Sequence, residues 1–158
     1  MIEFKTGNMF DQDCEYIINT VNCVGVMGKG VAFAFKNKYP EMFAEYKKEC
    51  EVGNIDIGKP FIWKYKDMFE PQIVINLPTK MHWKDPSTLV YIQNGLNWLR
   101  NYFENKPNST VVMPALGCGN GGLDWDTVKN MIQESLEDLK TQFFVYEPGG
   151  FSMNQWGN

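Results

Sequence analysis

Two glycine-rich segments, far apart in the chain, constrain the fold more than any other feature of this sequence. Residues 19–32 follow the apolar run 16–18 and lead into a helical pattern, and residues 114–125 stand in the same relation to the run 110–113. Glycines allow positive φ and a close approach of ligand, and the first N–H groups of a helix have no intrahelical partner. Together with the helix dipole, each segment makes an anion site, so the pair predicts a ligand with two phosphates.

The rest of the pattern predicts alternating strands and helices. Strands are expected at residues 2–5, 16–20, 61–65, 73–77, 110–113 and 143–146, and helices at 30–39, 41–50, 85–103 and 124–139. This alternation is typical of a three-layer α/β/α sandwich around a mainly parallel mixed sheet, where ligands bind at the carboxyl ends of the strands. At 158 residues, the chain is expected to form a single domain over residues 1–158.

Polar residues and a proline mark where two of the helices should begin. Asp85 followed by Pro86 predicts the start of the third helix, with the aspartate as cap and the proline in the first turn. Apolar residues at 3-4-3-4 spacing over residues 89–103 indicate its buried face. Asp124 or Asp126 is expected to cap the fourth helix.

Charge and composition argue against some classes of function. The net charge is −4, and only one of the fifteen basic residues, Arg100, is the arginine that usually reads guanine and phosphate. Sequence reading of duplex DNA is therefore not expected, although an enzyme acting on one modified nucleotide is compatible. No apolar run approaches the ~20 residues of a membrane span, and the N-terminal residues do not resemble a signal peptide. A cytoplasmic protein without a membrane partner is expected.

The cysteines and the single histidine do not form a metal-binding pattern. Cys14, Cys23, Cys50 and Cys118 are scattered, and His82 has no partner at ligand spacing, so neither disulfides nor a metal site nor a cofactor is expected. Two of the cysteines lie within the glycine-rich segments. They are interpreted either as small residues packed close to a ligand, which is favoured, or as reactive thiols.

The two segments together resemble the macrodomain, an ADP-ribose-binding fold. The resemblance is carried by residues 19–22, 28–32 and 117–122, with Thr6-Gly7-Asn8 and residues 144–146 in the expected order, and it covers essentially the whole chain. Within that family, residues 24–30, 77–80, 116–119 and 121–125 are most similar to the DNA ADP-ribosyl glycohydrolases that act as antitoxins in DarT–DarG systems.

The resemblance implies a hydrolase that removes ADP-ribose from nucleic acid, foremost from thymidine in DNA. The implied partners are ADP-ribose, ADP-ribosylated single-stranded DNA and a cognate ADP-ribosyltransferase toxin. A related branch acting on modified glutamate has an aspartate where this chain has Gly121, which argues against protein substrates. Such antitoxins usually carry a further C-terminal region, so an isolated domain or a stand-alone relative is expected. Two alternatives are an ADP-ribose 1''-phosphate phosphatase and a non-catalytic ADP-ribose reader.

The resemblance also assigns residues to the site. Lys80 is the expected catalytic residue, as nucleophile, proton carrier or stabilising charge, because N-glycosidic cleavage passes through an oxocarbenium-like centre. Asn22, also assigned to catalysis, would bind the distal ribose, with a loop-capping role as the alternative. Contacts to ADP-ribose are expected from Asn8, Met9, Glu15, Asn22, Gly28, Lys29, Gly30, Val31, Gly117, Cys118, Gly119, Asn120, Gly121, Gly122 and Tyr146.

Three side chains in or near this set have competing interpretations. Glu15 would accept a hydrogen bond from the adenine amino group, or is simply a surface acid. Tyr146 would border the adenosine, or packs in the core. His82 and Trp83 would position a base by stacking, or pack their own loop, which is the favoured interpretation.

Overall fold

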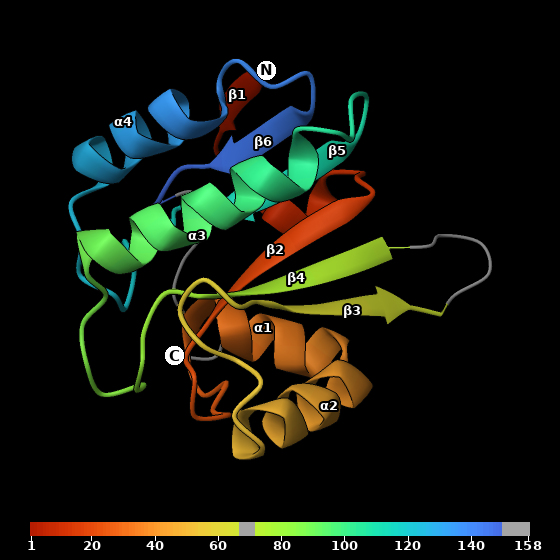
Figure 1. The fold of residues 1–158 in the computed structure, drawn as a ribbon, viewed down its shortest axis with the longest axis vertical. Coiled ribbons are helices and arrows are strands. Elements are labelled where there is room, and N and C mark those ends of the chain that lie inside the picture. Colours follow the sequence, from red (N-terminus) through yellow and green to blue (C-terminus); the bar gives the residue numbers. More distant parts are fainter. Residues whose placement is uncertain (67–71, 150–158) are drawn as a thin grey trace.

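The computed structural model describes residues 1–66 and 72–149 and contains six strands, four α-helices and one 3-10 helix in that part of the chain (Figure 1). In chain order these elements are β1 (Ile2–Lys5), the 3-10 helix η1 (Met9–Asp11), β2 (Tyr16–Val21), α1 (Gly30–Lys38), α2 (Pro40–Glu51), β3 (Phe61–Tyr65), β4 (Gln72–Pro78), α3 (Leu89–Phe103), β5 (Thr110–Pro114), α4 (Trp125–Leu136) and β6 (Gln142–Tyr146).

The strands form one sheet in the order β1-β6-β5-β2-β4-β3. Every neighbouring pair is parallel except β3 and β4, which are antiparallel. The prediction of a mainly parallel mixed sheet is therefore confirmed. The turn expected between β3 and β4 falls largely on residues 67–71, which lie outside the described residues.

Helices cover both faces of this sheet, α3 and α4 on one side and α1 and α2 on the other (Figure 1). Alternate strand residues point to opposite faces, so each strand contributes to two cores. Ile18 and Val111 pack with α3 and α4, whereas Ile17 and Val112 pack with α1 and α2. The three-layer sandwich is confirmed.

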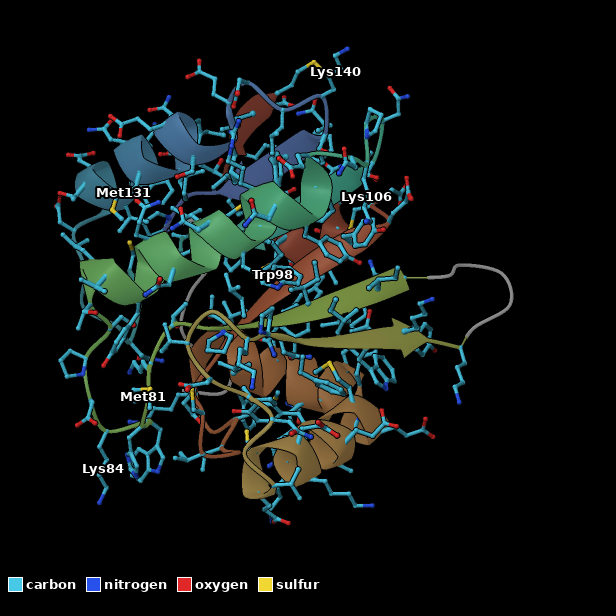
Figure 2. The ribbon with its side chains drawn as sticks, in the orientation of Figure 1. Met81, Lys84, Trp98, Lys106, Met131 and Lys140 are labelled. Carbon is cyan, nitrogen blue, oxygen red and sulfur yellow. The ribbon has the colours of Figure 1, made fainter. Side chains whose placement is uncertain are left out.

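The parallel strands bring five connecting segments, those after β1, β2, β4, β5 and β6, to one edge of the sheet. Val21 at the end of β2 pairs with Pro78 at the end of β4, and Pro114 at the end of β5 pairs with Tyr146 at the end of β6. The two glycine-rich segments therefore meet the loop after β4, where Figure 2 labels Met81 and Lys84. None of the helices in the two described ranges is both long and apolar enough to cross a membrane.

One predicted helix start was wrong. Helix α3 begins at Leu89 with Thr88 as cap, whose side chain accepts a hydrogen bond from the Tyr91 N–H at 3.2 Å. Asp85 and Pro86 instead belong to the preceding loop, which is anchored because the Ser87 N–H donates to Gly121 O at 3.1 Å. A tertiary contact with the second glycine-rich segment thus takes precedence over the local helix signal.

The fourth helix is capped by Asp124, which resolves the choice between the two aspartates. Its side chain accepts from the Thr127 N–H at 3.1 Å, and Asp126 lies in the first turn. The helix ends at Leu136, so Leu139 belongs to the turn that follows, where it is nevertheless buried in the core.

Candidate functional site

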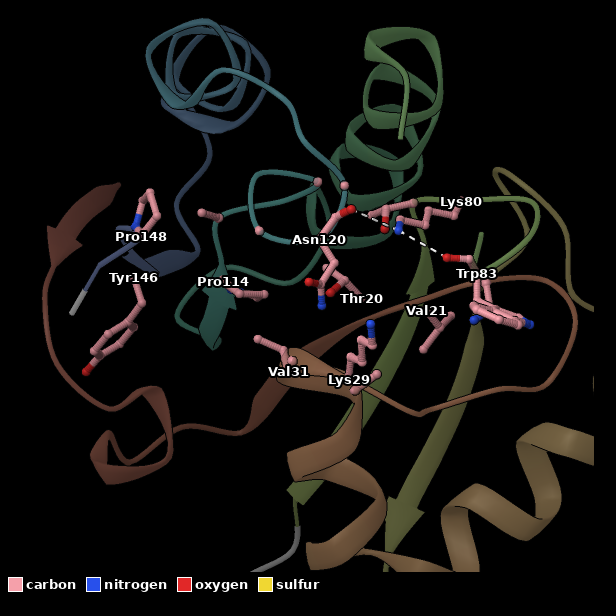
Figure 3. A pocket seen from close by; sticks show the side chains of 18 of the residues that line it. Thr20, Val21, Lys29, Val31, Lys80, Trp83, Pro114, Asn120, Tyr146 and Pro148 are labelled. Carbon is pink, nitrogen blue, oxygen red and sulfur yellow. Dashed lines mark hydrogen bonds between the residues drawn. The ribbon is translucent and has the colours of Figure 1, made fainter. Parts of the chain in front are cut away.

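A cavity of about 570 Å³ lies at the edge of the sheet where these five segments meet (Figure 3). Its walls are Met9 and residues 20–22, 26, 28–32, 79–80, 83, 114–115, 117, 119–121 and 146–149. A volume of this size is typical of sites for small-molecule or nucleotide ligands. It is the position that a parallel sheet of this kind favours for binding.

Most of the residues assigned from the sequence come together here. Those that line the cavity are Met9, Asn22, Gly28, Lys29, Gly30, Val31, Lys80, Gly117, Gly119, Asn120, Gly121 and Tyr146. Four others do not line it, namely Asn8, Glu15, Cys118 and Gly122.

Glu15 is at the wrong end of its strand for this cavity. It precedes β2, whereas the glycine-rich segments follow the strands, and the six residues of β2 span about 20 Å. Its side chain is exposed and its backbone N–H donates to Thr110 Oγ1 at 2.9 Å. The structure therefore does not bring Glu15 to the cavity for the expected adenine contact, and its position is that of a surface acid.

The other three residues shape the loops that form the cavity. Asn8 Oδ1 caps the 3-10 helix by accepting from the Phe10 N–H at 3.0 Å, which leaves its neighbour Met9 facing the cavity. The Gly122 N–H closes a turn on Gly119 O at 3.1 Å. Burial raises the pKa of the Cys118 thiol to about 11, so it is protonated at neutral pH, which fits the packing interpretation.

The first glycine-rich segment is organised around Asn22. Its Nδ2 donates to Val26 O at 2.7 Å, and its Oδ1 accepts from the N–H groups of Val24 and Val26 at 3.1 and 3.3 Å. The buried Tyr46 hydroxyl lies 2.7 Å from Asn22 O and 3.0 Å from Asn22 Oδ1. The loop-capping role is thus present, and one Nδ2 hydrogen remains for a ligand. Its contact with ribose stays a prediction.

The second segment is packed too closely for a side chain at Gly121. A Cβ there would lie 2.4 Å from Gly117 O and 2.5 Å from Ser87 Oγ. The same Gly117 oxygen accepts from the Leu123 N–H at 3.0 Å. The glycine that replaces the aspartate of the related branch is therefore required by this loop conformation.

Asn120 of the second segment lies close to Gly30 of the first, across the cavity. A Cβ on Gly30, which has a φ of +61°, would lie 2.9 Å from Asn120 Nδ2. In Figure 3, Asn120 and Lys29 extend into the cavity from opposite walls. Helix α1 begins at Gly30 without a side-chain cap, so its first N–H groups are free to meet an anionic ligand.

The Lys80 amine is hydrogen-bonded to backbone oxygens of two different segments of the cavity wall. Its Nζ donates to Asn120 O at 3.0 Å and to Trp83 O at 3.4 Å, as the dashed lines in Figure 3 show. Partial burial lowers the pKa of Lys80 below the ordinary lysine value; nearby Asp85 opposes this shift and Lys29 adds to it. The result is a fixed amine whose neutral form is more accessible than that of a surface lysine.

Residues 147–149 and Trp83 line the cavity but were not assigned to the ADP-ribose site from the sequence. The first group follows β6, the fifth parallel strand that ends at this edge, and this position in the chain is the signal that could have found it. Glu147 accepts from Trp125 Nε1 at 2.9 Å and from Lys129 Nζ at 3.5 Å, so its carboxylate is engaged in structural contacts. Within the two described ranges, no group of three or more His, Cys, Asp or Glu residues could hold a metal ion.

Comparisons with known proteins converge on one family. The family model described as Macro domain matches residues 18–132. The DNA ADP-ribosyl glycohydrolase of Mycobacterium tuberculosis is 43% identical over 153 residues, which are 96% of this chain and 44% of that protein. The chain thus spans less than half the length of this relative and of the Thermus aquaticus protein with the same name.

Solved structures agree with this result. The macrodomain of Mycobacterium tuberculosis DarG has a TM-score of 0.89 at 42% identity, covering 94% of this chain and 99% of that one. Thermosipho africanus DarTG in complex with ADP-ribose has a TM-score of 0.86 at 31% identity, covering 96% of this chain and 42% of that one.

Proposed function

Since this chain belongs to the macrodomain family, we propose that it binds ADP-ribose in the cavity at the sheet edge and hydrolyses the bond joining it to a nucleic-acid base, foremost thymidine in DNA. The observation that carries the proposal is the Lys80 amine, held by Asn120 O and Trp83 O beside the two glycine-rich segments. The relatives named DNA ADP-ribosyl glycohydrolase support the same activity.

The two segments suit the two phosphates of ADP-ribose. The uncapped start of α1 at Gly30 offers main-chain N–H groups on one side, and the open backbone at Gly119 does so on the other. Lys29 and Lys80 add positive charge to the cavity wall. The adenosine then extends toward Tyr146, and the distal ribose toward Lys80, where the base to be released is attached.

The reaction replaces a C–N bond with a C–O bond at the anomeric carbon. The electron pair of the broken bond leaves with the base, water supplies the new oxygen, and one proton passes from that water to the base. We assign this proton transfer to Lys80, because its lowered pKa gives the amine a usable neutral form. Direct attack by the amine is the competing role, and it would leave a covalent adduct detectable by mass spectrometry.

The test is release of ADP-ribose from an ADP-ribosylated oligonucleotide, followed by mass spectrometry. Lys80→Ala should lower the rate at least 100-fold while still binding ADP-ribose, consistent with the usual size of general acid–base effects. Lys140→Ala, which removes an exposed lysine outside the cavity, is the matched control and should keep full activity. Equal rates for the two variants would refute the assignment.

Two further measurements distinguish the rival activities. Phosphate released from ADP-ribose 1''-phosphate, independently of Lys80, would indicate the phosphatase. Tight ADP-ribose binding without any product would indicate a reader module.

We further propose that a cognate ADP-ribosyltransferase supplies the substrate. One relative, 29% identical over 157 residues, is named as a fusion of DNA ADP-ribosyl transferase and DNA ADP-ribosyl glycohydrolase from Thermosipho africanus. A cytoplasmic location is proposed because all four cysteines are unpaired, as is usual in a reducing compartment.

A further inference from the structure

We propose that the loop after β4 carries a stacking subsite, centred on Trp83, for a nucleobase next to the modified one. This inference rests on the proposed function and deepens it: the substrate would be an ADP-ribosylated single strand recognised beyond its modified nucleotide. The loop in question is residues 81–84, called the aromatic loop below.

Trp83 is more exposed than the other three tryptophans of the described ranges. Its side chain is 46% exposed, whereas Trp63 is buried and Trp98 and Trp125 are half-buried. Trp98 stacks on Tyr102, and Trp125 donates its indole N–H to Glu147. Among these four tryptophans of the described ranges, Trp83 alone presents much of its ring to solvent.

The exposed ring belongs to a larger apolar rim beside the cavity. Met81 is 42% exposed, and Val24 and Val26 of the first glycine-rich segment are also exposed. The two loops are joined because the Cys23 N–H donates to Met81 O at 3.0 Å. The rim therefore continues the wall of the cavity, to which Val26 and Trp83 both contribute.

Local contacts hold the aromatic loop in shape. The rings of His82 and Trp83 stack at 5.5 Å between centroids with 29° between their planes. His82 Nδ1 accepts from the Lys84 N–H at 3.1 Å. This preorganised ring pair lowers the entropy cost of binding a third, planar group.

The surrounding charge favours a nucleic acid as that group. Lys84 Nζ lies over the Trp83 ring, 5.1 Å from its centroid, and Lys29 and Lys80 line the adjoining cavity. The nearby acids are Asp85 and Glu147, and the Glu147 carboxylate already accepts hydrogen bonds from Trp125 and Lys129. Figure 2 shows Lys84 at the outer edge of the molecule next to this loop. Aromatic side chains interleaved with basic ones are the usual means of binding single strands, with bases on the rings and phosphates on the lysines.

The position of Trp83 fixes which part of the strand it would meet. Its backbone oxygen accepts a hydrogen bond from Lys80 Nζ at 3.4 Å, so Trp83 lies next to the residue that we place at the reacting sugar. ADP-ribose fills the cavity inward from that point, and the strand must leave outward past the rim. A base adjoining the modified one is then the group that reaches the ring.

The experiment compares a modified nucleoside with a modified oligonucleotide of about five nucleotides. For the unaltered chain, kcat/KM should be higher for the strand, and Trp83→Ala should reduce the strand-to-nucleoside ratio by about tenfold, within the range known for base stacking. Trp83→Phe, which keeps a ring, should retain most of the ratio. Tyr65→Ala removes an exposed ring at the far end of the antiparallel strand β3 and should leave the ratio unchanged.

A ratio near one for the unaltered chain, or an unchanged ratio in Trp83→Ala, would overturn the proposal. If the transferase bound less tightly to Trp83→Ala while the ratio stayed constant, the rim would be a protein contact instead, again against the proposal. If neither substrate released ADP-ribose, the proposed hydrolase activity would be wrong, but the subsite could still be tested by binding. The measurement would then be the ratio of the dissociation constants for the modified strand and free ADP-ribose, on the same variants.

Discussion

Replacing Gly121 with alanine tests whether close packing of the second glycine-rich segment holds the site together. The added Cβ would meet Gly117 O at 2.4 Å, about 1 Å inside ordinary contact, and Ser87 Oγ at 2.5 Å. The carbonyl cannot swing away cheaply, because it accepts the Leu123 N–H, and Gly121 O in turn accepts the Ser87 N–H. The substitution therefore forces the loop away from its neighbours.

The expected cost follows from these contacts. Overpacking of this kind costs about 1–3 kcal/mol, and loss of one hydrogen bond adds about 1 kcal/mol. Gly121→Ala should lower the free energy of unfolding by roughly 2–4 kcal/mol, and for a chain of this size lower Tm by about 5–12 °C. Activity should fall as well, since the neighbouring Asn120 O holds the Lys80 amine.

Two other glycines of the same loop provide graded controls. Gly122 has a φ of +78° but open space around its Cβ position, so Gly122→Ala should cost only the left-handed backbone, roughly 1–2 kcal/mol. Gly119 has neither restriction, and Gly119→Ala should be near neutral. Urea and thermal unfolding of the three variants should rank them in that order. If Gly121→Ala unfolded like Gly119→Ala, the packing described for this loop would be incorrect.

Other consequences are equally open to measurement. Gly119→Glu should raise the calorimetric Kd for ADP-ribose at least tenfold, because it sets a negative charge beside the diphosphate; unchanged affinity would mean that the loop does not bind the phosphates. The pH–rate profile should rise with pH and level off below the ordinary lysine pKa, since the pKa of Lys80 is lowered and the neutral amine is the active form; a falling profile would favour the ammonium. The Arg100 guanidinium donates hydrogen bonds to both carboxylate oxygens of Asp138 and lowers the pKa of that carboxyl group to about 2. The small contribution of this ion pair to the free energy of unfolding should therefore be present above the normal carboxyl pKa and be lost as pH falls through 2. An NMR titration midpoint near 4 for Asp138 would contradict this. Thr88→Ala should cost about 1 kcal/mol in urea unfolding by removing the cap of α3, whereas Asp85→Ala should not remove a cap.

Features that depend on nearby residues were predictable from the sequence. The apolar runs, the alternation of strands and helices and the two glycine-rich segments predicted the sheet, its three layers and the edge at which the cavity lies. Lys80 and most of the loop residues were assigned from the family resemblance, and they lie in the connections that follow strands of that sheet. The cap of α4 was narrowed to Asp124 or Asp126 by the local pattern, and the structure selects Asp124.

Contacts between distant segments were not predictable in this way. Helix α3 begins at Leu89 and not at the predicted Asp85, because the Ser87 N–H of the preceding loop is hydrogen-bonded to Gly121, 34 positions along the chain. Glu15 was assigned to the adenine by its resemblance to a family position, but it precedes β2 and lies at the opposite end of that strand from the cavity, as the predicted strand at residues 16–20 already implied.

Hydrophobic periodicity and glycine act over a few residues, and these local patterns were enough to predict that parallel strands carry two glycine-rich turns to a common edge. Which side chains close around the cavity, how the Lys80 amine is held and the exposure of Trp83 beside it became known from the three-dimensional structure. The reason is physical: burial, desolvation and hydrogen bonding across the cavity depend on distances between segments that the order of residues does not contain.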